Sequence, residues 1–91
     1  MIRIDFRGKF EREYEELTLE NQEIKKLILK KIELFEKNPE DTRLDNHALK
    51  KKMKGKWAFS ITGDIRIVHK WTGKKTVRFL AIGPHIKVYK N

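Results

Sequence analysis

Three residues in the second half of this chain could together cleave a phosphodiester bond: His47, Arg66 and His85. An imidazole can either accept or deliver a proton at a reacting oxygen, which makes the two histidines candidates for acid and base. Arg66 carries a permanent charge that can hold a phosphate through two hydrogen bonds. Cleavage of RNA without a metal needs a base for the 2′-hydroxyl, an acid for the leaving 5′-oxygen and cations around the phosphorane. These three residues can supply all of those groups.

Other polar side chains have both a functional and a structural interpretation. Asp64 is either a group that orients a histidine or acts as a base, or a turn residue beside glycine. Tyr89 either stacks on a nucleobase or hydrogen-bonds to the scissile phosphate, or packs at the chain end. The structural alternative for Arg66 is an ion pair, although acids are scarce nearby. His69 falls on the apolar face of a predicted strand with Ile67, which favours a packing role, so we leave it out of the site.

Positive charge is concentrated in the second half of the chain. Residues 46–91 contain twelve Lys and Arg against one acid, and residues 1–45 contain ten against twelve, so +11 and −2 sum to the net charge of +9. A field this lopsided is typical of proteins that bind a polyanion. The densest run is Lys50, Lys51, Lys52, Lys54 and Lys56. The alternative for such a run is a solvated loop, but its basic surroundings favour contacts with RNA phosphates.

Length and composition narrow the class of protein. Ninety-one residues favour one domain, residues 1–91, with a modest core. The absence of cysteine excludes disulfides and thiolate metal sites, and the histidines show no recognised ligand spacing, so we expect no metal and no cofactor. No apolar stretch approaches the roughly 18 residues of a membrane span, and charges interrupt the N-terminal segment. We therefore expect a soluble, cytoplasmic protein with no membrane partner.

The apolar residues predict the elements that must position these groups. Alternation over residues 2–6 predicts a strand, and helical spacing predicts a helix from about Gly8 to Leu17. After a turn, a longer apolar stripe predicts a second helix that ends at Asn38-Pro39, because the residue before proline avoids helical dihedral angles. Residues 39–56 are expected to form a long loop, which favours a functional role. Three further strands are expected over residues 57–61, 65–71 and 76–82.

This order of elements predicts an α+β fold. Turns at residues 62–64 and 72–74 join the last three strands into successive hairpins. The two helices form a hairpin and pack on one face of an antiparallel meander of three to four strands, preceded by the N-terminal strand. The other face of the sheet, or its rim, is then left for the basic residues.

Several short segments, taken in order, carry a resemblance to a known family. They are Asn38-Pro39, Arg43-Leu44, His47-Ala48-Leu49, Lys54-Gly55, and residues 57–61, 64–68, 80–85 and 88–89. Together they resemble the RelE/ParE toxin superfamily, and most of all the YafQ- and YoeB-like mRNA interferases of type II toxin–antitoxin modules. The resemblance covers essentially the whole chain, including the order of elements predicted above.

The resemblance implies a ribosome-dependent endoribonuclease that cuts mRNA in the A site without a metal. Attack by the 2′-hydroxyl of the substrate would leave a 2′,3′-cyclic or 3′-phosphate and a 5′-hydroxyl. Five residues match functional positions of the family: a catalytic histidine, an aspartate, a phosphate-binding arginine, a C-terminal acid or base and a terminal aromatic, namely His47, Asp64, Arg66, His85 and Tyr89. The lysine run resembles the basic loop that contacts ribosomal RNA and message.

The resemblance also implies partners and leaves two alternatives. The partners are the ribosome, with its RNA and A-site mRNA, and a small antitoxin whose flexible segment wraps the toxin. Ser60 departs from the family, because some relatives carry histidine or arginine there. This departure implies that activity is weaker here or that other residues carry it.

One alternative is a ParE-type toxin that inhibits DNA gyrase by binding, against which the histidines argue. The other is a catalytically inactive relative that binds a nucleic acid or the ribosome.

Overall fold

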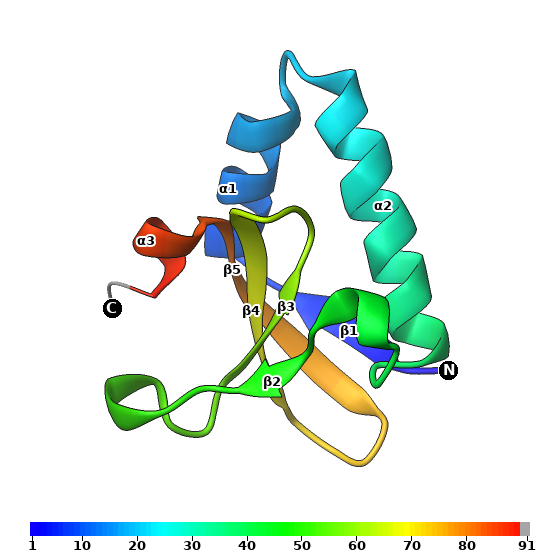
Figure 1. The fold of residues 1–91 in the computed structure, drawn as a ribbon, viewed down its shortest axis with the longest axis vertical. Coiled ribbons are helices and arrows are strands. Elements are labelled where there is room, and N and C mark those ends of the chain that lie inside the picture. Colours follow the sequence, from blue (N-terminus) through cyan, green and yellow to red (C-terminus); the bar gives the residue numbers. More distant parts are fainter. Residues whose placement is uncertain (90–91) are drawn as a thin grey trace.

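The apolar patterns of the sequence correspond to a sheet covered on one face by two long helices (Figure 1). The computed structural model describes residues 1–89. The strands of the sheet are β1 (Arg3–Phe6), β2 (His47–Ala48), β3 (Trp57–Ser60), β4 (Ile65–Trp71) and β5 (Thr76–Pro84). The helices are α1 (Gly8–Thr18), α2 (Gln22–Lys37) and the short α3 (His85–Val88). Two 3₁₀ turns, Thr42–Leu44 and Lys51–Met53, flank β2.

The sheet has the strand order β1-β5-β4-β3-β2. Strands β3, β4 and β5 form successive antiparallel pairs, as the hairpin turns predict, and β2 adds an antiparallel partner for β3. The first strand, however, lies parallel to β5, with Arg3 opposite Thr76 and Phe6 opposite Phe79. The expected antiparallel sheet of three to four strands is therefore one part of a mixed, five-stranded sheet.

The main core lies between the long helices and the sheet. Its buried residues include Ile28 and Phe35 of α2, Phe59 and Phe79 of the sheet, and Phe10 of α1. These residues recur at helical spacing on the helices and at alternate positions on the strands, so each element presents one apolar face. The long helices thus cover one face of the sheet and do not contact the other face.

The ends of α2 follow from local chemistry. The Asn21 side chain accepts a hydrogen bond from the Ile24 backbone N–H at 3.0 Å, which satisfies one of the free donors at the start of the helix. The helix ends at Lys37, and Asn38 is extended before Pro39, as predicted from the proline. The apolar stripe in between predicts this element closely because 3.6-residue periodicity over four turns is a strong signal.

A second, smaller core lies on the opposite face of the sheet. It contains Met53, Ala58, Val68, Ala81 and Val88, with Tyr89 packed against it. Val68 is buried in this core because α3 and the segment around Met53 cover the end of that face. Figure 1 shows both segments on the side of the sheet away from α2.

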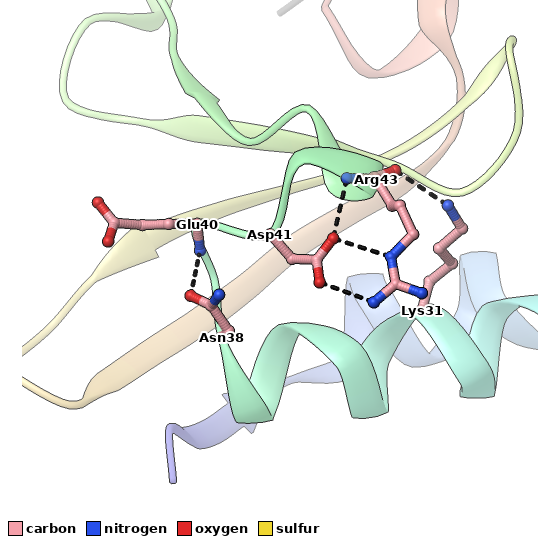
Figure 2. A network of polar contacts seen from close by, with 5 residues as sticks. All are labelled: Lys31, Asn38, Glu40, Asp41 and Arg43. Carbon is pink, nitrogen blue, oxygen red and sulfur yellow. Dashed lines mark hydrogen bonds and ion pairs between the residues drawn. The ribbon is translucent and has the colours of Figure 1, made fainter.

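The segment 39–56 is more ordered than the expected loop. Asp41 accepts hydrogen bonds from the Arg43 backbone at 2.9 Å and from its guanidinium Nε at 3.0 Å and Nη2 at 2.8 Å (Figure 2). Lys31 of α2 donates to the Arg43 carbonyl at 3.0 Å, and Leu44 is fully buried. The first 3₁₀ turn is therefore fastened to α2 immediately before β2, the strand that carries His47.

No helix within residues 1–89 is both long and apolar enough to cross a membrane.

Candidate functional site

The candidate residues from β2 and β4 lie on the sheet face that the long helices leave free. His47 is opposite Ala58, and Ala58 is opposite Val68, so all three point to the face of the smaller core. Ser60 and Arg66 face each other two residues further along and share this face. Since β3 lies between β2 and β4 and the two residues are offset by two positions along the strands, roughly 12 Å of sheet separates the backbones of His47 and Arg66. Both side chains leave the sheet on this same face.

His47 is exposed, and one of its ring nitrogens is held by the backbone. Its Nδ1 lies 2.8 Å from the carbonyl oxygen of Asp45. A carbonyl oxygen only accepts hydrogen bonds, so Nδ1 must carry the proton that it donates. The neutral ring therefore has its lone pair on Nε2, the nitrogen that can accept a proton. Asp45 makes this contact from a left-handed conformation with φ 50°, which aspartate tolerates better than most residues.

Arg66 is half-buried near the start of β4. Its Nη1 donates to the Thr62 carbonyl at 2.8 Å, which fixes one side of the guanidinium. The other donors remain available for a phosphate, because a guanidinium has five N–H groups. Arg66 is also close enough to Tyr89 for its charge to stabilise a phenolate there.

His85 and Tyr89 come together through α3. The His85 backbone donates to the carbonyl of Asp64 at 2.8 Å, and the Tyr89 backbone donates to the carbonyl of His85 at 3.2 Å. Their rings meet edge to face with 4.3 Å between centroids. Burial raises the pKa of Tyr89, and the nearby Arg66 charge opposes that rise. The Tyr89 hydroxyl is buried beside the Arg66 guanidinium, and by geometry it makes no hydrogen bond among residues 1–89.

Asp64 contributes to the site through its backbone. It lies exposed in the turn between β3 and β4, where the Thr62 hydroxyl accepts a hydrogen bond from the Asp64 N–H at 3.2 Å. Its carbonyl receives the His85 N–H described above. Within residues 1–89 its carboxylate makes no hydrogen bond to a histidine. The geometry therefore favours the turn interpretation of Asp64 over the orienting one.

The lysine run borders a groove that ends at Tyr89. The groove has a volume of about 460 Å³ and is lined by Leu49, Lys50, Lys51, Lys52, Met53 and Tyr89. Lys54 and Lys56 belong to the same segment but do not line the groove. Three ammonium groups beside a half-buried aromatic ring form a surface suited to a single-stranded nucleic acid, which offers phosphates and stacking bases.

Two residues that shape this groove were missed in the sequence. Met53 is buried in the smaller core, and Leu49 packs against that core. The Leu49 N–H donates to the Lys56 carbonyl at 2.8 Å, which closes the lysine segment on itself. The sequence does contain a signal for them: two apolar residues beside and within a lysine run indicate that the segment packs against a core.

His69 lies in the main core, as its place on an apolar strand face predicts. It is fully buried, and its ring packs against those of Phe35 at 5.0 Å and Phe59 at 5.7 Å between centroids. Its Nε2 lies 3.0 Å from the Asn46 side-chain oxygen, whereas Nδ1 has no partner among residues 1–89. Burial lowers the pKa of His69 to about 4, so the ring is neutral.

Within residues 1–89, no three His, Asp or Glu side chains are grouped so that they could hold a metal ion. The donors that gather on the free face of the sheet are instead an arginine, a phenol, two imidazoles and lysines.

Solved structures of bacterial toxins share this fold. The YoeB/ParE toxin from Agrobacterium tumefaciens superposes with a TM-score of 0.79 at 19% identity, over 92% of this chain and 99% of that one. YafQ from Escherichia coli strain BL21(DE3) gives 0.78 at 20% identity, over 98% and 99%. A chain of the E. coli DinJ–YafQ complex gives 0.73 at 21% identity, over 98% and 99%. At these identities the likeness establishes a common fold.

A comparison with curated protein sequences found no match. The family model for the bacterial toxin of type II toxin–antitoxin systems, YafQ, matches residues 2–90. Since this match spans nearly the whole chain, including the free sheet face and the segment that carries His85 and Tyr89, the protein belongs to the YafQ family of type II toxins.

Proposed function

We propose that this toxin is a ribosome-dependent endoribonuclease that cuts mRNA in the A site. The observation that carries the proposal is the cluster of Arg66, His85 and Tyr89, of which Tyr89 also lines the lysine-rich groove. A guanidinium, a phenol and an imidazole are the groups expected around a phosphate that undergoes transesterification. A protein that inhibits by binding alone does not need them in one place.

In the proposed reaction, the 2′-oxygen of the substrate attacks the adjacent phosphorus and the bond from phosphorus to the 5′-oxygen breaks. His47 is the base, because its Asp45 contact leaves Nε2 free to take the 2′-hydroxyl proton. His85 in its protonated form is the acid that delivers a proton to the leaving 5′-oxygen. The products are a 2′,3′-cyclic phosphate and a 5′-hydroxyl. After the reaction His47 carries a proton and His85 has lost one. Proton exchange with water restores both starting forms.

Arg66 and Tyr89 have a different role in this scheme. Charge builds on the non-bridging oxygens of the phosphorane, where the free donors of Arg66 stabilise it. The Tyr89 hydroxyl donates a further hydrogen bond to the same oxygens. Ser60 faces Arg66 from β3 and provides a hydroxyl but no charge, so the scheme places no proton transfer on it.

The lysine groove and the net charge of +9 support RNA and the ribosome as partners. Lys50, Lys51 and Lys52 would contact phosphates of the message or of ribosomal RNA, with a steep dependence on salt. Such a protein acts in the cytoplasm, where translation takes place. We also propose a cognate antitoxin as partner, because YafQ occurs in a DinJ–YafQ complex in E. coli and YoeB in a YoeB–YefM complex in Staphylococcus aureus.

The test is cleavage of a message on programmed ribosomes. Purified protein is added to ribosomes with a defined A-site codon, and both new ends are mapped. Cuts within the A-site codon, with a 5′-hydroxyl and a cyclic or 3′-phosphate, are expected. They should disappear in His47→Ala and His85→Ala. Arg78→Ala is the matched control, because Arg78 pairs with Asp5 at 2.9 Å on the distant β1 edge of the sheet.

A folded protein that binds ribosomes but leaves the message intact would contradict the nuclease proposal. A gyrase supercoiling assay is then the next measurement, since ParE-type toxins inhibit that enzyme without cleaving RNA.

A further inference from the structure

The buried histidine of the main core is connected to the exposed histidine of the site. The His69 ring is surrounded by Phe35, Phe59, Trp71 and Phe79, which offer it no hydrogen bond. Its one polar contact within residues 1–89 joins Nε2 to the Asn46 side-chain oxygen at 3.0 Å. The amide oxygen of Asn46 only accepts, so Nε2 of His69 carries the proton and donates it.

Asn46 stands directly before His47, and the two side chains point to opposite faces of the sheet. His47 shares its face with Ala58 and the smaller core, whereas Asn46 reaches the helix side where His69 lies. Successive residues of an extended segment alternate in this way. A bond that holds Asn46 toward the core therefore also sets the direction in which His47 leaves the backbone.

Asp45 completes the connection. Its positive φ of 50° turns its carbonyl toward the His47 ring, where it accepts the proton on Nδ1 at 2.8 Å. This conformation is costly for a residue other than glycine and persists where neighbouring contacts hold it. On one side Leu44 is fully buried, and on the other the His69 contact holds Asn46. Loss of either contact would let the carbonyl turn away from the ring.

We propose that His69 is a positioning residue for His47, acting through Asn46 and the Asp45 carbonyl. It keeps His47 in the form with the proton on Nδ1 and with Nε2 turned to the free face of the sheet. The proposal rests on the proposed function only for its effect on RNA cleavage, since the state of the His47 ring can be measured without any substrate.

The test compares three single variants with the wild type. His69→Phe keeps an aromatic ring in the core but removes the donor. His69→Gln places an amide N–H near the position of Nε2 and is expected to restore the contact. Asn46→Ala removes the acceptor at a partly exposed position and leaves the core unchanged. If His69→Phe fails to fold, Asn46→Ala still breaks the same bond.

The first measurement is the ¹⁵N NMR spectrum of the imidazole rings above neutral pH, with the His47 signals assigned from their loss in His47→Gln. In the wild type and in His69→Gln we expect the proton of His47 on Nδ1. In His69→Phe and Asn46→Ala the signals should move toward the average of a free imidazole, in which Nε2 carries much of the proton.

The second measurement is the cleavage rate on ribosomes, expected to fall about 10- to 100-fold in His69→Phe and Asn46→Ala with ribosome affinity unchanged, because small misplacements of a catalytic group cost this much. Recovery in His69→Gln would support positioning. An unchanged His47 spectrum in a folded His69→Phe or Asn46→Ala protein would overturn the proposal, whether or not cleavage falls. A wild type with the expected spectrum but no cleavage would refute the nuclease alone.

Discussion

The rings of His85 and Tyr89 lie edge to face, 4.3 Å apart between centroids and inclined by 77°. One turn of backbone joins them, since the Tyr89 N–H donates to the His85 carbonyl. The tyrosine ring thus supports the histidine, while its hydroxyl lies near Arg66. Ring and hydroxyl have separate roles that substitutions can distinguish.

Tyr89→Phe should separate these two roles. The ring contact with His85 is kept, so the protein should remain as stable as the wild type, but the donor beside Arg66 is lost. We expect cleavage on ribosomes to fall about tenfold, since one neutral hydrogen bond to the transition state contributes roughly 1.4 kcal/mol. Tyr89→Ala should lose more activity and about 1 to 2 kcal/mol of stability, because a half-buried ring is removed. Equal activity in wild type and Tyr89→Phe would remove the hydroxyl from the mechanism.

Arg66→Ala is expected to lower the cleavage rate by about 10²- to 10³-fold, the usual effect of removing a donor that stabilises a developing anion. Arg66→Lys should recover part of this loss, because lysine keeps the charge but not the fork of donors. Single-turnover cleavage on ribosomes separates this effect from binding. The control is again Arg78→Ala, whose ion pair with Asp5 is largely exposed and should affect stability by less than about 1 kcal/mol.

Periodicity accounts for what the sequence revealed of the fold. The bounds of β4 and the extent of α2 followed from repeated apolar positions, and the burial of His69 followed from strand alternation. Periodicity could not reveal β2, because two residues have no period, or α3, which has four. The parallel pairing of β1 with β5 joins segments about 70 residues apart, and no local pattern contains it.

The sequence predicts a set of candidate residues but not their arrangement. The two histidines and Arg66 are candidates because of their chemistry, whereas the Asp45 carbonyl contacts His47 through a backbone conformation that residue type alone does not specify. The groove was hidden for a similar reason. Met53, which lines the groove, is buried in one cluster with Val68 and Val88, residues far from it in the sequence.

Replacing Lys50, Lys51 and Lys52 by glutamine should reduce the salt dependence of RNA binding. Each phosphate contact contributes about −0.7 to the slope of log K against log salt for a single strand, so the slope should become shallower by about 2. The matched variant replaces Lys70, Lys74 and Lys75, which lie around the turn between β4 and β5, away from the groove. Binding of a fluorescent single-stranded RNA at several salt concentrations measures both. An equal change in the two variants would show that the groove has no special role.

The stability of the protein should fall between pH 6.5 and pH 4. His69 has its pKa lowered to about 4 by burial, against 6.5 for an exposed histidine. In this range the unfolded chain binds a proton that the folded protein does not, so stability decreases as the pH falls through it and levels off below about 4. The groups that face the ring are aromatic or neutral, namely Phe35, Phe59, Trp71, Phe79 and Asn46.

Integrated over that range, the loss is at most roughly 3 kcal/mol. Urea unfolding at several pH values measures it. Between pH 6.5 and pH 4, the free energy of unfolding should fall less in His69→Phe than in the wild type, and the difference should equal this loss. Parallel curves for the two proteins would mean that His69 titrates alike in the folded and unfolded states.

Gly55→Ala tests the conformation of the lysine segment. Gly55 has φ of 93°, and a Cβ placed there would meet no atom within 4 Å, so the cost is backbone strain alone. We expect a loss of about 1 to 2 kcal/mol. Gly63→Ala is the matched control, with equal space and no left-handed backbone, and should be neutral or slightly stabilising. Thermal unfolding measures the stability of both variants. Equal melting temperatures for Gly55→Ala and Gly63→Ala would contradict the positive φ assigned to Gly55.

The position of β1 at the edge of the sheet has a consequence for folding while the chain is being synthesised. Its partner is β5, so residues 3–6 have no strand to pair with until residues 76–79 have been made. The ring of Tyr89 follows ten residues later still. On a translating ribosome, the last part of the chain is hidden in the exit tunnel while the first part is already outside. The five-stranded sheet is therefore complete only once residues 76–79 have left the exit tunnel.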